Sequence, residues 1–256
     1  MLIKSQNLSQ KLVMNTTLNY SLNFDIKKRK KREIKFIIFH YTGMKKETDA
    51  IKRLVDRKSK VSCHYLIKKN GEVLKLVPDL YVSWHAGVSS WKKYKSINKH
   101  SIGIEISNPG HEHKYSKFKK AQINSILKLS KFLIKKYKIK SKHVLGHSDI
   151  SPDRKKDPGE KFPWKDLSKK KIGYWHNLNQ KELLRERNKN ITKKEIKNFS
   201  KNLYKIGYIK KTGKYKSKYL KILTIAFQRR FRQELINGII DKECLIISKN
   251  IVKKFL

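Results

Sequence analysis

Two side chains suited to metal binding, His147 and Asp157, lie ten positions apart in a turn-rich stretch, residues 146–164. Three prolines restrict the backbone of this stretch, so its side chains have less freedom than those of an ordinary surface loop. Histidine and carboxylate are common ligands of a catalytic zinc ion, which takes three protein ligands and keeps one position open. The stretch therefore indicates a metal site, for which the rest of the chain must supply a third ligand, proton-transfer groups and a groove.

Two further candidates stand on predicted strands. Residues 34–40 (Ile-Lys-Phe-Ile-Ile-Phe-His) are a short apolar run typical of a buried strand, and His40 ends it. Ligands of α/β sheets usually bind at the carboxyl ends of strands. In residues 101–107, three isoleucines share one strand face and Glu105 points to the other. Structural roles remain open: the histidines can be satisfied by hydrogen bonds, Asp157 can begin a turn, and Glu105 can pair with surface lysines.

The elements around these residues predict an α/β domain with a mixed central sheet. A hairpin is indicated by Asn70-Gly71 between two apolar alternating runs, and two segments carry apolar residues at helical spacing. The order strand, helix, hairpin, strand, helix, strand predicts helices packed on a mixed sheet. The predicted strands are residues 34–40, 61–67, 72–77, 101–107 and 142–145; the predicted helices are residues 48–57 and 116–137; residues 82–100 are predicted as loop.

The last quarter of the chain predicts a small helical domain. Thr192 and Glu195 have the spacing of a capping box, which opens a helix that ends at Gly207, and two more helices are predicted at residues 219–231 and 241–253. We therefore expect four parts: an irregular segment at 1–30, the α/β domain at 31–168, a linker at 169–190, and an all-α three-helix domain at 191–256.

The composition is strongly basic, with 64 Lys and Arg against 20 Asp and Glu and a net charge of +44. Such a charge can reflect a polyanionic partner or the lysine-rich drift of an AT-rich genome. Lysines occur in every region, which favours drift. A specific nucleic-acid partner is not expected, because helix-turn-helix, zinc-finger and RRM motifs are lacking.

The two cysteines, Cys63 and Cys244, provide no disulfide framework and no Cys-x-x-Cys motif, so a metal must be held by His and Asp. No apolar run reaches the roughly 18 residues that a membrane span needs. Near the start, neither a cleaved signal peptide nor a lipidation cysteine is visible.

Five motifs resemble those of the zinc N-acetylmuramoyl-L-alanine amidases, in the same order and within about residues 34–165. They are residues 39–43 (Phe-His-Tyr-Thr-Gly), 62–67 (Ser-Cys-His-Tyr-Leu-Ile), 84–87 (Trp-His-Ala-Gly), 101–105 (Ser-Ile-Gly-Ile-Glu), and Gly146-His147 with Asp157-Pro158-Gly159. The resemblance implies the fold shared with phage T7 lysozyme and the peptidoglycan recognition proteins. Residues 226–231, with Gly238 and Asp241, resemble the three-helix peptidoglycan-binding domain. This pairing is similar to that in AmiD-type amidases of Gram-negative bacteria.

The resemblance implies a role for each candidate. His40, His147 and Asp157 would be the ligands of one zinc ion, and Glu105 would be the catalytic acidic residue. Lys155 would face the oxyanion. His85 and Arg154 would contact the substrate. The implied activity is hydrolysis of the amide between N-acetylmuramic acid and the L-alanine of the stem peptide, in cell-wall turnover or recycling.

The alternative function is a non-catalytic peptidoglycan sensor of the same fold, which the complete set of candidate ligands argues against. We expect a monomer that acts on peptidoglycan or muropeptides. The envelope or periplasm is favoured by the substrate and the C-terminal domain, whereas the lack of a visible signal peptide leaves the cytoplasm open. The choice between intact and 1,6-anhydro muramic acid and the preferred stem peptide do not follow from the sequence.

Overall fold

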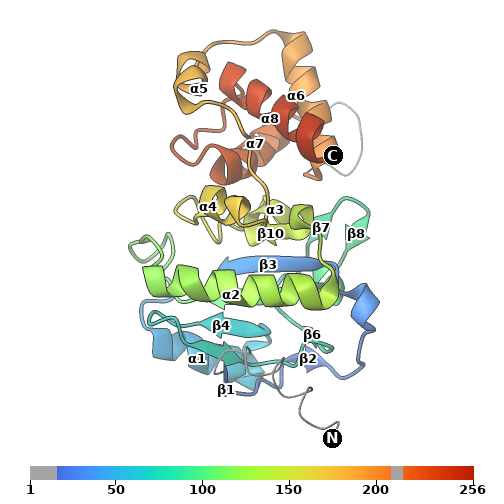
Figure 1. Ribbon diagram of the computed structural model, residues 1–256, viewed down its shortest axis with the longest axis vertical. Coiled ribbons are helices and arrows are strands. Elements are labelled where there is room, and N and C mark those ends of the chain that lie inside the picture. The colour runs from blue at the N-terminus through green and yellow to red at the C-terminus, as the bar shows by residue number, and fades with distance from the viewer. Residues whose placement is uncertain (1–15, 209–215) are drawn as a thin grey trace, which may run out of the picture.

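A mixed sheet forms the centre of the computed structural model, which describes residues 16–208 and 216–256 (Figure 1). Within those residues the sheet has six strands in the order β1-β5-β4-β9-β3-β10. Their bounds are β1 (Thr16–Leu18), β5 (Val73–Lys75), β4 (Tyr65–Ile67), β9 (Ser101–Ile106), β3 (Phe36–Tyr41) and β10 (Val144–Gly146).

Strands β4, β9, β3 and β10 run parallel, so their carboxyl ends lie at one edge of the sheet. Strand β5 is antiparallel to β4 and follows the predicted Asn70-Gly71 turn, where Gly71 has a φ of +89° that glycine adopts without strain. In the register of β3 and β9, His40 pairs with Glu105. The sheet thereby brings a candidate ligand and a candidate proton-transfer group together.

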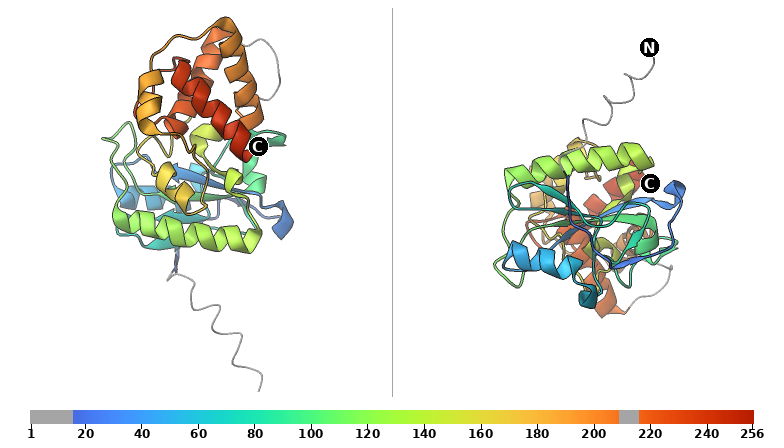
Figure 2. Two further views of the ribbon diagram at one scale, coloured as in Figure 1. Left: turned by 45° about the horizontal axis from the view of Figure 1, so that its top comes forward. Right: turned by 90° about the horizontal axis from the view of Figure 1, so that it is seen from below.

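Helices cover both faces of the sheet (Figure 2). Helix α2 (Lys120–Tyr137) buries Ile126, Leu129 and Leu133 against side chains of β3 and β9 that include Phe39 and Ile104. On the other face, α1 (Glu47–Val55) packs Leu54 onto a smaller cluster of β4 and β5 residues. Burying each such side chain stabilises the fold by about 1.5–3 kcal/mol, which holds the strand ends in fixed positions.

Beyond β10 the chain turns directly into α3 (His147–Ile150) and, after the loop that carries Asp157, into α4 (Trp164–Lys169). The C-terminal helices pack beyond the β10 edge of the sheet (Figure 1). They are α5 (Gln180–Glu186), α6 (Lys193–Ile206), α7 (Ser217–Phe231) and α8 (Lys242–Phe255).

The start of α6 confirms the predicted capping box. The Glu195 backbone N–H donates to Thr192 Oγ1 at 3.2 Å, while the Thr192 N–H donates to the Glu195 carboxylate at 2.9 Å. The helix ends at Gly207, as the sequence predicts.

One buried cluster joins the C-terminal helices to the sheet. It contains Phe36, Ile38 and Leu145 from the sheet together with Phe199, Phe227 and Ile247 from α6, α7 and α8. The helices lie beyond the sheet, as expected, but their apolar faces pack onto it. Residues 169–190 take part as well, because Tyr174 and Leu183 are buried in the same cluster.

Several boundaries differ from the expectation. Residues 1–30 are not wholly irregular, because β1 pairs with β5 and β2 (Phe24–Asp25) pairs with β6 (Val82–Ser83). These pairs form between distant segments, which local sequence does not reveal. The expected loop at residues 82–100 holds short elements: β6, β7 (Ser90–Trp91), β8 (Tyr94–Lys95) and a 3₁₀ turn η3 (Ile97–His100). The other 3₁₀ turns are η1 (Lys31–Glu33), η2 (Arg57–Ser59) and η4 (Ser141–His143).

Among the helices of residues 16–208 and 216–256, none combines the length and apolar character needed to cross a membrane.

Candidate active site

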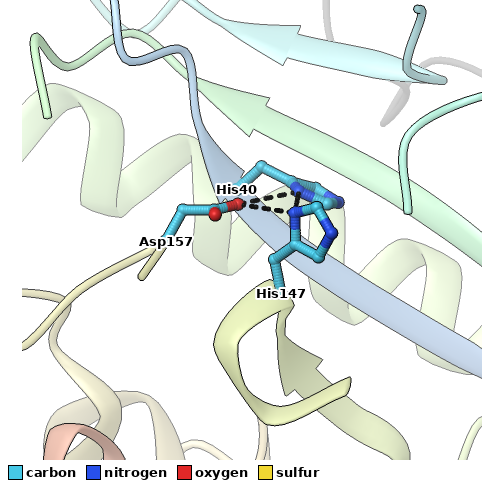
Figure 3. Close-up of side chains that lie close together, drawn as sticks. All are labelled: His40, His147 and Asp157. Carbon is cyan, nitrogen blue, oxygen red and sulfur yellow. Dashed lines mark hydrogen bonds and ion pairs between the residues drawn. The ribbon is translucent and has the colours of Figure 1, made fainter. Parts of the chain in front are cut away.

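Three predicted ligands meet at the carboxyl edge of the sheet (Figure 3). The Nδ1 atoms of His40 and His147 are 3.0 Å apart, and Asp157 Oδ2 lies 2.9 Å and 3.0 Å from them. All three residues are buried. Two imidazole nitrogens and one carboxylate oxygen that converge in this way can hold a metal ion.

The local fold explains why these side chains converge. His40 lies near the end of β3, and His147 is the first residue of α3, directly after β10, which pairs with β3. The loop returns beside them, where the Ser148 N–H donates to the Asp157 carbonyl oxygen at 2.8 Å. Gly146 leaves room for this return, because a Cβ there would lie 2.6 Å from Pro158 Cδ.

Protonation in the site suits a cation. Burial, reinforced by the neighbouring His147, lowers the pKa of His40 to about 4, so its imidazole is neutral at pH 7. Burial alone would raise the pKa of Asp157, but the neighbouring imidazoles of His147 and His40 hold it below its usual range. The site therefore presents a neutral imidazole and an ionised carboxylate, the forms in which these groups bind metals.

Outer hydrogen bonds leave the two Nδ1 atoms free to be ligands. His147 Nε2–H donates to the Ala86 carbonyl oxygen at 3.1 Å. With its proton on Nε2, His40 donates to His85 Nδ1 at 3.0 Å, and His85 Nε2–H in turn donates to Ser101 Oγ at 3.0 Å. The Ser101 hydroxyl ends the series by donating to the Ile97 carbonyl oxygen at 2.7 Å. Such outer partners fix the tautomer and ring orientation of a ligand histidine.

Glu105 lies on β9, next to His40 in the strand register. Its Oε2 is buried and has no hydrogen-bond partner among the described residues. Burial, together with the negative charge of Asp157, raises the pKa of Glu105 to about 8, although Lys155 opposes the shift. A carboxyl group with this pKa exchanges a proton readily near neutral pH.

These groups line a cavity of about 460 Å³. Lys155, Arg154 and His85 are all in its wall, so the structure brings every predicted site residue to one place. Arg154 is also tied to the neighbouring loop, because its Nη2 donates to the carbonyl oxygens of Ala86 and Val88 at 2.8 Å and 2.6 Å. His85 both lines the cavity and forms a hydrogen bond with His40.

The cavity wall and its surroundings include residues to which the sequence analysis assigns no role. His111, which has no role in the motifs, accepts from or donates to Tyr41 Oη at 2.9 Å and lies 3.0 Å from Glu160. Tyr115 stacks on the His111 ring at 4.4 Å. No sequence signal points to this cluster, because its members come from the end of β3, the segment between β9 and α2, and the loop before α4.

Asp149 belongs to none of the sequence motifs, but it has a structural role. It is buried, and its carboxylate accepts hydrogen bonds from Gly146 N–H, Tyr208 and Arg230. Two of these partners, Tyr208 and Arg230, lie 59 and 81 positions further along the chain, so local sequence does not reveal them.

Comparison with known proteins identifies the family. A family model described as N-acetylmuramoyl-L-alanine amidase matches residues 30–160, which is more than half of the chain. The chain belongs to the N-acetylmuramoyl-L-alanine amidase family. The predicted resemblance is confirmed. All three residues of the buried ligand set, His40, His147 and Asp157, lie within the matched range.

The amidase is similar to relatives of two lengths. It is 32% identical to N-acetylmuramoyl-L-alanine amidase AmiD of Escherichia coli over 234 residues, 87% of this chain and 83% of the relative. It is 38% identical to 1,6-anhydro-N-acetylmuramyl-L-alanine amidase AmpD of the same organism over 105 residues, 41% of this chain and 55% of that protein. The AmiD match covers 87% of this chain and therefore includes part of the C-terminal helices.

Two solved structures match most of the chain. The complex of Escherichia coli AmiD with anhydro-N-acetylmuramic acid-L-Ala-D-gamma-Glu-L-Lys superposes with a TM-score of 0.76 at 31% identity, covering 87% of this chain and 90% of that one. AmpDh3 from Pseudomonas aeruginosa, solved with anhydromuramic pentapeptide, gives a TM-score of 0.76 at 28% identity over 93% of this chain and 98% of that one. The fold predicted from the sequence is confirmed.

Proposed function

We propose that this amidase uses a zinc ion, held by His40, His147 and Asp157, to hydrolyse the amide between N-acetylmuramic acid and the L-alanine of stem peptides. The observation that carries the proposal is the convergence of the three ligand atoms, 2.9–3.0 Å apart, in a cavity that also contains Glu105. The natural setting of this reaction is cell-wall turnover or recycling.

The residues present fit zinc. His40 and His147 would supply two nitrogen ligands and Asp157 one oxygen ligand, which is the number of protein ligands of a catalytic zinc site, and all three residues line the cavity. Cysteine is not needed: Cys63 is buried outside the ligand cluster, and its thiol donates to the Tyr65 carbonyl oxygen. When bound, zinc supplies Lewis acidity, which lowers the pKa of water to about 7 and polarises a carbonyl.

Glu105 is proposed as the proton-transfer residue. Its unpartnered, buried carboxyl group lies beside His40 in the sheet register and faces the cavity. It accepts a proton from the attacking water and delivers it to the departing L-alanine nitrogen, which leaves as an amine. General acid–base catalysis of this kind contributes about 10²–10⁴-fold.

The basic residues of the cavity are proposed to handle negative charge. Lys155 faces the oxyanion that develops on the lactyl carbonyl oxygen, where a fixed positive charge stabilises the transition state. Arg154 and His85 are proposed to contact the substrate from the cavity wall, and His85 also supports His40. The anhydromuramyl peptides in the two similar complexes support a muropeptide as substrate.

One chain contributes every group of the site, so we propose that the monomer is active. The helical region at 191–256 is proposed to bind peptidoglycan, as its motif resemblance implies. A specific nucleic-acid partner is not part of this proposal.

The test measures bound zinc and peptide release from a 1,6-anhydro muropeptide for three variants of the full chain. We expect His147→Ala to lose both zinc and activity, because it removes a ligand. Glu105→Gln should keep zinc and lose activity by about 10²–10⁴-fold, because it removes only proton transfer. His143→Gln is the control, since His143 packs on Phe36 away from the cavity and should retain both properties.

Two outcomes would contradict the proposal. Wild-type protein that binds muropeptide without zinc and without cleavage would favour the sensor function. An active Glu105→Gln variant would show that another group transfers the proton.

A further inference from the structure

The C-terminal helices reach the short helix that carries His147. Arg230 of α7 is 2% exposed, and its Nη1 donates to Asp149 Oδ2 at 2.7 Å. Tyr208, just after α6, donates its hydroxyl hydrogen to Asp149 Oδ1 at 2.5 Å. Each carboxylate oxygen of Asp149 is therefore bound by a residue from the helical region.

Asp149 connects these helices to the candidate metal ligand His147. It lies two residues after His147 in α3, and its Oδ2 also accepts a hydrogen bond from the Gly146 N–H at 2.8 Å. This bond closes the first turn of α3 around His147. Because α3 has only four residues, it has little helical stability of its own, and its geometry depends on such contacts.

A second contact of Arg230 leads toward strand β3. The Arg230 guanidinium stacks on the Trp164 ring, with Cζ 3.7 Å from the ring centroid. Trp164 packs on Phe39, the neighbour of His40, with ring centroids 5.8 Å apart. Arg230 thus contacts Asp149, two residues from His147, and Trp164, which packs on the strand that carries His40.

The ion pair of Arg230 and Asp149 could serve only to join two packed regions. The placement argues for more, because the acidic partner is the residue that caps the ligand helix rather than a residue elsewhere on the shared surface. Arg232, two residues along, shows the ordinary case: it is buried and pairs with Asp241 and Glu243 inside the helical region.

We infer that Tyr208 and Arg230 are positioning residues that hold His147 in its metal-binding orientation through Asp149. The C-terminal helices are then part of the metal site as well as a candidate binding module. This inference rests on the proposed zinc site. It assigns the two residues no contact with substrate or with the reacting atoms.

The test compares Arg230→Met with Arg232→Met in the full chain. Both changes remove a buried, ion-paired arginine from the same end of α7, so both should reduce stability. Zinc affinity is measured by competition with a chelator, at a temperature where both variants are folded. We expect Arg230→Met to weaken zinc binding by about 10-fold, as is typical for outer partners of metal ligands. Arg232→Met should change it by less than about twofold.

A second, milder variant keeps the test valid even if Arg230→Met does not fold. Tyr208→Phe removes only the hydroxyl group that binds Asp149, and we expect it to weaken zinc binding in the same direction but less than Arg230→Met. Amide hydrogen exchange of Gly146 in the zinc-free protein gives a second readout, because the N–H is held by Asp149. It should exchange faster in Arg230→Met and in Tyr208→Phe than in Arg232→Met.

Equal zinc affinities for Arg230→Met and Arg232→Met, or unchanged zinc affinity and Gly146 exchange in Tyr208→Phe, would overturn the inference. Failure of the proposed function has a different signature. If the wild-type chain bound no zinc, the zinc site would be wrong, and with it this inference. If wild-type protein binds zinc and the variants bind it equally well, the site stands and the positioning role is wrong.

Discussion

Glu105 and Asp157 are two carboxyl groups of one cavity whose surroundings drive their pKa values apart. Asp157 is stabilised as an anion by two imidazoles, whereas Glu105 has a buried oxygen without a partner among the described residues. Burial and the nearby Asp157 raise the pKa of Glu105 to about 8. Such separated pKa values are how enzymes assign one carboxylate to hold charge and another to move protons.

This difference predicts a pH dependence of stability in the zinc-free protein. Unfolding restores the ordinary pKa of Glu105, so between about pH 4.5 and 8 the unfolded chain releases a proton that the folded chain keeps. The folded state therefore loses stability as pH rises through this range, and retains it at lower pH. Relative to Glu105→Gln, wild type should lose on the order of 3 kcal/mol between pH 5 and pH 8.

Unfolding by urea at both pH values measures the difference, and the isosteric glutamine variant cancels the other titrating groups. Parallel changes in wild type and Glu105→Gln would show that the pKa of this carboxyl group is not raised.

Much of the site was accessible from sequence because its residues lie in local motifs. His40 at a strand end, Glu105 beside Gly103, and the His147 to Asp157 spacing each carry a signal within a few positions. Asp149 and His111 carry none, since their roles depend on partners at positions 208, 230 and 160. The contact of His85 with His40 was also invisible, because it depends on how a loop folds over the sheet.

At the scale of elements, the two faces of β9 have different roles: one packs into the core, and the other borders the candidate active site. Ile102, Ile104 and Ile106 pack into the core under α2, whereas Gly103 leaves space for the imidazole of His85. A Cβ at position 103 would overlap this ring. The glycine is therefore explained by the support of His40 through His85 rather than by backbone conformation.

Gly103→Ala should consequently displace His85 and weaken zinc binding by about 10-fold or more, the range for loss of an outer partner. Chelator competition checks this value. Ile102→Val is the matched control on the opposite face: it should cost about 0.5–1.5 kcal/mol of stability and leave zinc affinity unchanged. If Gly103→Ala bound zinc as tightly as wild type, the role assigned to His85 would be wrong.

The long, strongly patterned elements were predictable, whereas the short strands were not. Helix α2 and the β4–β5 hairpin follow from apolar spacing and from a glycine turn. Strands β2, β6, β7 and β8 have two residues each, too few for any periodic pattern. Strands β2 and β6 exist because distant segments pair, whereas β7 and β8 pair locally across a tight turn.

At the scale of the whole molecule, the sheet and the C-terminal helices share one core. Trp91 packs edge-on against Tyr208 at 5.1 Å, and one buried cluster contains residues of both regions, from Phe36 to Ile251. Sequence suggested a separate helical domain because its helices carry their own caps and apolar stripes. Patterns of this kind show that a face is buried but do not show against what.

A shared core predicts that the full chain unfolds in one cooperative transition. Scanning calorimetry should give one peak with equal calorimetric and van't Hoff enthalpies, and zinc should move the whole peak upward. Two peaks, with only one of them moved by zinc, would show that the helical region unfolds independently of the metal site.

The most direct test of the account is hydrolysis of a 1,6-anhydro muropeptide in ¹⁸O-labelled water, analysed by mass spectrometry. The zinc-loaded amidase should place one ¹⁸O in the lactyl carboxylate of the muramic acid and release an unlabelled peptide with a free L-alanine amine. Zinc-stripped protein should release none. Cleavage at a different bond, or release that does not depend on zinc, would contradict the assignment of His40, His147, Asp157 and Glu105.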